Sequence, residues 1–202
     1  MRLPPAFQHR RFALLWGGLL ISIAGSQMQS AALLWHLRTL SDQPIVVSGI
    51  GLARFLPIVL LSMIGGVVAD RFNRRRILFI TQTIMALEAL TLSLLTLTGV
   101  IQVWHIYLLT GIQAAAIAFD LPARQSLVPN LVPRTDLPSA FSLQSIAFNT
   151  GAILGPMLGG VMIATPGLNT VYLFNALSFG AVLLALALMG PVEQAAAAPL
   201  PR

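Results

Sequence analysis

Two ionisable residues, Arg54 and Glu88, lie deep inside long apolar stretches, where a charge is costly and usually serves a function. At about 1.5 Å per helical residue, Arg54 lies roughly 22 Å from Ala69 and Glu88 roughly 17 Å from Ile77, the residues that end their stretches. Their depths differ by about 6 Å, which a long arginine side chain can bridge. The pair indicates either a structural ion pair or a desolvated Glu88 that holds a proton near neutral pH.

A second set of polar residues follows one face of the first apolar stretch. At 100° per residue, four side chains fall within an arc of about 80°. This polar stripe consists of Ser22, Ser26, Gln29 and His36. It predicts either a face that lines a cavity or a face that hydrogen-bonds to other helices. Gln113 and Asn149 are weaker candidates of the same kind in later stretches.

The residue types argue against enzymatic chemistry. The chain has no cysteine, and all 12 of its basic residues are arginine, so thiolate metal sites, a phosphate-loop lysine and a Schiff-base lysine are excluded. Its three histidines lack the spacing of a metalloprotease, and no serine has the setting of an intramembrane nucleophile. We therefore expect neither an enzyme nor a bound metal or cofactor.

Composition indicates an integral membrane protein. The 202 residues are 56% apolar and only 9% charged, whereas soluble domains carry roughly 25% charged residues. The formal net charge of +6 does not predict nucleic-acid binding, because the arginines stand between the apolar stretches and form no long basic face.

Six stretches are long enough to span a bilayer, which takes about 20 residues each. They cover residues 12–37, 45–69, 77–99, 103–121, 139–164 and 170–190. Uninterrupted apolar stretches of this length must be helices, because lipid offers the backbone no hydrogen-bond partner. The sequence thus predicts an all-α membrane protein with a tail at 1–11, a six-helix bundle at 12–190 and a Pro/Ala-rich tail at 191–202.

The arginines predict how the bundle is oriented. Ten of the 12 lie in the two tails and in the connections after the second and fourth stretches, whereas the opposite connections carry Arg38 alone. Because positive residues collect on the cytoplasmic side, both termini are expected in the cytoplasm.

The stretch that ends the second span, GGVVADRFNRRRIL (65–78), resembles the signature between helices 2 and 3 of the major facilitator superfamily. The residues that match are Gly66, Ala69, Asp70, Arg71, Arg74, Arg75 and Leu78, with Arg76 completing the arginine cluster. Asn73 replaces the usual glycine and is expected to tolerate a left-handed turn. Apart from this resemblance, Gly65 and Gly66 favour close approach of another helix.

A second signature lies in the fifth span. GAILGPMLGG (151–160) resembles the antiporter motif of drug-exporting members of the superfamily. The residues that match are Gly151, Gly155, Pro156, Gly159 and Gly160. Gly151 and Gly155 form a small-xxx-small face that predicts a close helix contact, and Pro156 removes one backbone hydrogen bond.

Residues 9–18 and 119–143 resemble the branch that contains the enterobactin exporters and macrolide-efflux proteins. Members have twelve helices in two halves, so the chain resembles the N-terminal half. The resemblance implies a bacterial inner-membrane protein that moves a small solute by gradient-driven alternating access, with a siderophore, drug or similar compound exported. It also implies that Asp70 is a cytoplasmic latch, for which Arg124 is the best partner within the chain. A desolvated Glu88 that holds its proton would couple transport to the proton gradient, although the third helix of family members tends to lie outside the central cavity.

Two alternatives remain open for a chain of this length. It could be a truncated or half-length transporter that is inactive without a C-terminal six-helix half. It could also pair with a second copy, because six helices place both termini on one side and permit a parallel two-fold dimer. Lipid and a small-molecule substrate are the other expected partners.

Overall fold

The computed structural model describes residues 4–165, 167–190 and 192. Six of its helices are long and apolar enough to cross a membrane. Their bounds are α1 Arg10–Leu40, α2 Pro44–Arg71, α3 Arg74–Leu97, α4 Val103–Leu127, α5 Leu137–Ala164 and α6 Leu168–Met189. Three short 3₁₀ helices, η1 Pro5–Gln8, η2 Val128–Asn130 and η3 Arg134–Asp136, lie at one end of the bundle. The described residues contain no strand, and the predicted all-α fold with six spans is confirmed.

Each predicted span overlaps one helix, although most boundaries differ by one to three residues, and two differences bear on the site. α4 continues past the expected end at residue 121 to Leu127, with Pro122 inside the helix. α3 begins at Arg74, so Arg74, Arg75 and Arg76 form its first turn instead of a loop. The predicted tail at 191–202 lies outside the described residues apart from its second residue, as do the first three residues of the chain.

Asn73 shows why α3 starts early. Its side chain accepts a hydrogen bond from the backbone N–H of Arg76 at 3.1 Å, which is the geometry of an N-cap. Its φ of −64° is not left-handed, so the turn that we expected at this position is not the one formed. A capped helix start allows the chain to reverse between α2 and α3 with only Phe72 and Asn73 as linker.

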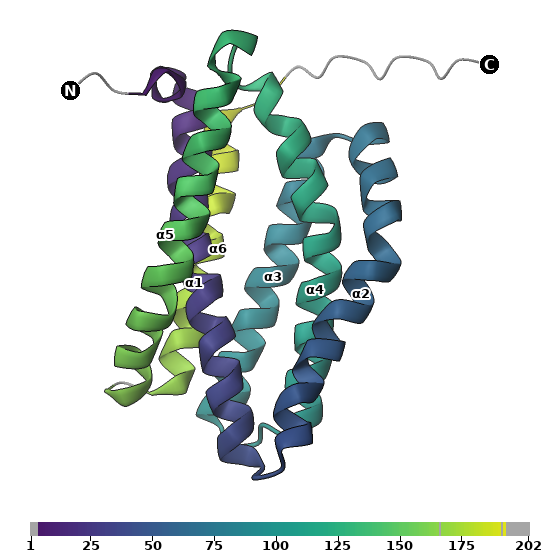
Figure 1. Ribbon diagram of the computed structural model, residues 1–202, viewed down its shortest axis with the longest axis vertical. Helices are drawn as coiled ribbons and strands as arrows, with labels where there is room; N and C mark the ends of the chain where they lie inside the picture. Colours follow the sequence, from purple (N-terminus) through teal and green to yellow (C-terminus); the bar gives the residue numbers. More distant parts are fainter. Residues whose placement is uncertain (1–3, 166, 191, 193–202) are drawn as a thin grey trace.

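The helices pack as a curved row in the order α5, α1, α6, α3, α4, α2. We call α1, α5 and α6 the α1 group, and α2, α3 and α4 the α4 group. The two groups meet where α3 packs against α6, whereas α1 and α4 make few contacts (Figure 1). Figure 1 shows the start of α1 and the end of α6 at the end of the bundle where the two groups are farther apart. We call this the arginine-rich end, since residues 4–11, 71–76 and 124–136 lie there.

Two close helix contacts depend on glycine. A Cβ atom at Gly65 of α2 would lie 2.2 Å from the carbonyl oxygen of Ala118 in α4. On α5, Cβ atoms at Gly151 and Gly155 would lie 2.6 Å and 2.5 Å from side-chain carbons of α1. These contacts agree with the predicted close approach at Gly65 and along the small-xxx-small face.

Two other glycines of the same signatures pack differently. A Cβ atom at Gly66 or at Gly160 would have no neighbour within 4 Å, so neither glycine is needed for packing inside this chain. Gly159, in contrast, continues the α5 contact face, because its Cβ would lie 3.3 Å from Met28 of α1.

Candidate functional site

A cavity with apolar walls and several polar lining residues lies between the two groups of helices. This central cavity measures about 290 Å³, and every one of the six helices contributes to its lining. α3 and α6, which join the groups, supply Met85 and Phe179. Its polar lining residues are Ser22, Ser26, Gln27, Ser30, Arg54, Gln113, Asp120 and Arg124.

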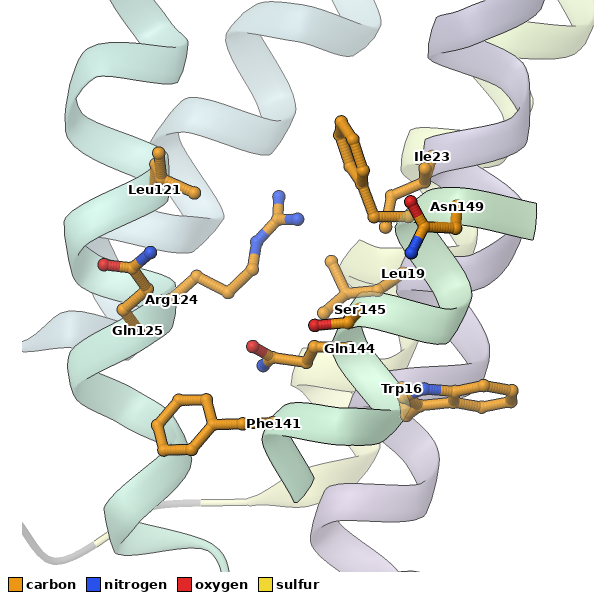
Figure 2. Close-up of a pocket in the computed structure, with 11 residues that line it drawn as sticks. Trp16, Leu19, Ile23, Leu121, Arg124, Gln125, Phe141, Gln144, Ser145 and Asn149 are labelled. Carbon is orange, nitrogen blue, oxygen red and sulfur yellow. The ribbon is translucent and has the colours of Figure 1, made fainter. Parts of the chain in front are cut away.

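Two further cavities adjoin the central one. The terminal cavity, of about 390 Å³, is lined by α1, α4 and α5 near the arginine-rich end (Figure 2). The distal cavity, of about 400 Å³, is lined by α1, α2 and α5. The terminal and central cavities share Ile23, Leu121, Arg124 and Phe148, and the central and distal cavities share Gln27, Ser30 and Arg54. Together the three cavities follow the length of the bundle between the two groups.

A buried ion pair stands where the terminal and central cavities meet. Asp120 is 3% exposed and pairs with Arg124 one helical turn later on α4. Its Oδ1 atom also accepts hydrogen bonds from Thr81 at 2.9 Å and from Gln82 at 2.8 Å, both on α3. Three donors thus satisfy the carboxylate, as a buried charge requires. Sequence reasoning missed Asp120, although the i,i+4 spacing of Asp120 and Arg124 was a usable signal.

The predicted pair between Asp70 and Arg124 is not formed in this structure. Arg124 is engaged by Asp120, and the exposed Asp70 side chain makes no hydrogen bond to any described residue. The reason is local, because an i,i+4 carboxylate inside the bundle offers Arg124 a partner that needs no helix movement.

The arginines beside Asp70 hold helix ends together. Arg74 donates to the carbonyl oxygen of Ser126 in the last turn of α4 at 3.2 Å. Arg75 donates twice to the carbonyl oxygen of Leu186 in the last turn of α6, at 2.9 Å and 2.7 Å. Cations at the C-termini of helices satisfy free carbonyl groups and oppose the helix dipole favourably. The remaining arginines of the cluster, Arg71 and Arg76, are exposed.

The structure separates Arg54 from Glu88. Arg54 lines the central cavity and donates to Ser30 Oγ at 3.2 Å. Glu88, 2% exposed, does not line that cavity, and its two carboxylate oxygens accept from Gln29 Nε2 at 3.2 Å and 3.1 Å. Arg54 and Glu88 each bond to another residue and form no ion pair with each other. The structural ion pair, which was the first interpretation of these two residues, is therefore not formed in this structure.

Gln29 connects Glu88 to a wider buried network. Its Oε1 atom accepts from Asn175 of α6 at 2.8 Å, and Asn175 Oδ1 accepts from Ser178 at 3.0 Å. The network therefore ties α1, α3 and α6 together where the two groups join. Every acceptor in it has a donor, which makes it a structural element of the bundle core.

The polar stripe of α1 divides between the two predicted roles. Ser22 and Ser26 line the central cavity. Gln29 belongs to the buried network, and His36 hydrogen-bonds to the Tyr172 hydroxyl of α6 at 3.0 Å. Of the weaker candidates, Gln113 lines the central cavity and Asn149 the terminal cavity. Pro156 lines the distal cavity.

Among the residues that the structure describes, no group of three or more metal-ligating side chains lies close enough to hold a metal ion. The lining of the three cavities is instead typical of a binding site for an organic molecule, with apolar walls and a few polar groups.

Comparison with known proteins shows that the chain matches one protein family along almost its whole length. The profile of the family described as transmembrane secretion effector, which is part of the major facilitator superfamily, matches residues 3–202. The uncharacterized MFS-type transporter YfiS of Bacillus subtilis is 31% identical over 69% of this chain and 32% of its own length. Macrolide efflux protein A of Streptococcus pyogenes is 27% identical over 86% of this chain and 42% of its own length.

The enterobactin exporter EntS of Citrobacter koseri is 30% identical over 54% of this chain and 26% of its own length. The chain thus spans less than half the length of each of these relatives. No solved structure matches it significantly.

Proposed function

Because the chain belongs to the transmembrane secretion effector family of the major facilitator superfamily, we propose that it forms the N-terminal half of an exporter of small organic solutes. The observation that carries this proposal is the series of three adjoining cavities between the α1 and α4 groups. A solute path needs polar lining groups inside an apolar bundle, and these cavities supply them. The names of two relatives, macrolide efflux protein A and the enterobactin exporter EntS, support siderophores, drugs or similar compounds as the substrate class.

We further propose that transport follows alternating access, driven by an ion gradient, in the inner membrane of a bacterium. In this mechanism the two halves of a transporter rock about a central site. The arginine excess supports a cytoplasmic position for the arginine-rich end and both termini. The wider separation of the two groups at that end then corresponds to a cytoplasm-facing state.

Asp70 is the proposed latch of the cytoplasmic side. Its exposure at the end of α2 leaves its carboxylate available to a part of the protein outside this chain. Gly66, one turn earlier, has open space where a Cβ would lie, so another helix can approach there. Arg74 and Arg75 hold the start of α3 against α4 and α6, which gives the latch a rigid support.

A second candidate is a chain that transports nothing alone. The specific observation in its favour is the coverage of less than half of each relative. A separately encoded C-terminal half or a second copy of the chain would then complete the transporter. The native mass in the host membrane separates these arrangements, because two 21.6 kDa chains and one chain with a different protein give different masses.

Transport itself is tested in inside-out vesicles from bacteria that lack their own major exporters. With an imposed proton gradient, we expect vesicles that contain the native protein to accumulate a labelled macrolide or siderophore above empty vesicles. No accumulation of either compound class would contradict the proposed function. Vesicles with this chain alone distinguish a self-sufficient dimer from an inactive half.

A further inference from the structure

Two buried hydrogen-bond donors without partners border the terminal cavity. Nε of Arg124 and Nε2 of Gln144 are both buried, and neither has an acceptor within hydrogen-bond distance among the residues that the structure describes. Figure 2 shows the two side chains extending from α4 and α5 into the space between these helices. An unpartnered buried donor is costly, so a pair of them on one cavity indicates that a ligand supplies the acceptors.

The charge of the cavities favours a negative ligand. Arg124 is the single charged residue among those that line the terminal cavity. The adjoining central cavity is lined by two arginines, Arg54 and Arg124, and by one carboxylate, Asp120. Asp120 does not use every donor of Arg124. It accepts from Nη2, which leaves the Nε–H group without a partner among the described residues. Glu88 is turned away from both cavities toward Gln29.

Besides the polar residues Gln125, Ser145 and Asn149, the terminal cavity has apolar and aromatic walls. Trp16, Phe141 and Phe148 contribute to its lining together with Leu19 and Leu121. The volume of about 390 Å³ lies within the range of small-molecule sites, which is roughly 300–1,000 Å³. Aromatic walls beside a guanidinium suit an aromatic or similarly apolar body that carries an oxyanion.

We propose that the terminal cavity binds the oxyanion group, such as a carboxylate, of an apolar organic solute through Arg124 Nε and Gln144 Nε2. The binding of the oxyanion does not depend on the proposed export function. Only the statement that the bound solute is also the transported one rests on that function. Arg124 supplies the charge and Gln144 fixes the orientation of the oxyanion from the opposite wall.

Equilibrium dialysis with two probes of the same shape tests this assignment. Tritiated 1-naphthoate carries the carboxylate, and 1-naphthamide replaces it with a neutral amide. The purified protein is placed in phosphatidylcholine nanodiscs, and binding to empty nanodiscs is subtracted. We expect saturable binding of naphthoate that is about tenfold or more tighter than that of naphthamide. Equal affinity for the two probes would overturn the proposal.

Two variants remove one donor each without breaking the buried ion pair. Gln144→Leu deletes an amide nitrogen that has no partner, so the fold loses no hydrogen bond from that atom. Arg124→Lys keeps a cation beside Asp120 but removes Nε. Each change should weaken naphthoate binding about tenfold and leave naphthamide binding unchanged. Naphthoate binding that survives both changes would refute the assignment.

Two control variants remove a guanidinium group and an amide group that lie outside the terminal cavity. Arg134→Gln deletes an exposed arginine at the same end of the bundle, and Gln43→Leu deletes an exposed amide at the opposite end. Neither residue lines the terminal cavity. We expect both variants to bind naphthoate as the unchanged protein does. A loss in the controls equal to that in the test variants would overturn the assignment to this cavity.

An anionic lipid headgroup offers the same chemistry as an anionic solute. A second titration in phosphatidylglycerol nanodiscs separates the two sources. An unchanged naphthoate affinity supports a solute site, whereas loss of binding would show that a lipid headgroup occupies the cavity and would overturn the solute proposal. Because dialysis requires no transport, this test is independent of the proposed function. A protein that transports but binds both probes equally contradicts this inference alone.

Discussion

Replacing Gly65 by alanine should destabilise the contact between α2 and α4. The added Cβ would lie 2.2 Å from the carbonyl oxygen and 3.0 Å from the carbonyl carbon of Ala118. Since a C···O contact normally measures about 3.3–3.6 Å, α2 must move away from α4 by about 1 Å. Both clashing atoms belong to the backbone, so no side-chain rotation relieves the overlap.

The size of the effect follows from two opposing contributions. Overpacking of this kind costs about 1–3 kcal/mol, and the better helix propensity of alanine returns up to about 1 kcal/mol. We therefore expect a loss of about 1–2 kcal/mol in the free energy of unfolding. For a chain of this size, that lowers the melting temperature by roughly 2–8 °C.

Gly66→Ala is the matched control. It introduces the same methyl group into the same helix one residue later, where nothing lies within 4 Å. Its unfolding free energy should stay equal to that of the unchanged protein or rise slightly. The assay is unfolding by SDS in mixed micelles, followed by tryptophan fluorescence. If Gly65→Ala proves as stable as Gly66→Ala, the close approach of α2 and α4 is incorrect.

Three further predictions concern the buried charges and the proposed latch. Arg124→Gln should cost about 3–5 kcal/mol because Asp120 stays buried without its cation, and adding Asp120→Asn should recover much of this loss in a double-mutant cycle. If the losses in unfolding free energy of the two single variants simply add in the double variant, the ion pair between Arg124 and Asp120 would be contradicted. Glu88→Leu should cost about 1–3 kcal/mol more unfolding free energy than Glu88→Gln, because only glutamine leaves Gln29 Nε2 an acceptor. A pH profile of transport that is identical in Glu88→Gln would remove a proton-coupling role for Glu88. Asp70→Asn should abolish vesicle transport at an unchanged protein level, and normal transport by this variant would contradict the latch.

The six spans were predictable because lipid leaves the backbone no alternative to helix once an apolar stretch is long enough. The start of α3 was harder, since hydropathy cannot distinguish a charged first helical turn from a loop. Asn73 followed by three arginines carried the missing signal, as an N-cap residue marks where a helix begins.

The candidate site was only partly predictable for a different reason. Helical periodicity places Ser22, Ser26 and Gln29 on one face of α1, but it does not say which neighbour each one meets. The packing of α6 against both α1 and α3 decides that Gln29 is buried and bonded to Glu88. The contact of Gln82 with Asp120 likewise joins residues 38 apart in sequence, on two successive helices.

We propose that water and solute reach the space between the two groups from the arginine-rich end. The chain contains no cysteine, so an introduced cysteine is the single thiol of this chain. Asn149 lines the terminal cavity on α5, and Leu177 is a 67% exposed residue of α6 at a matching distance from the arginine-rich end of its helix.

Labelling of these two positions with a membrane-impermeant thiol reagent, in inside-out and right-side-out vesicles, tests the claim most directly. We predict that Asn149→Cys reacts rapidly in inside-out vesicles, whereas Leu177→Cys, which lines none of the three cavities and is expected to face lipid, stays unlabelled. Labelling of Asn149→Cys that is no faster than that of Leu177→Cys from either side would contradict a solvent-accessible path between the two groups of helices.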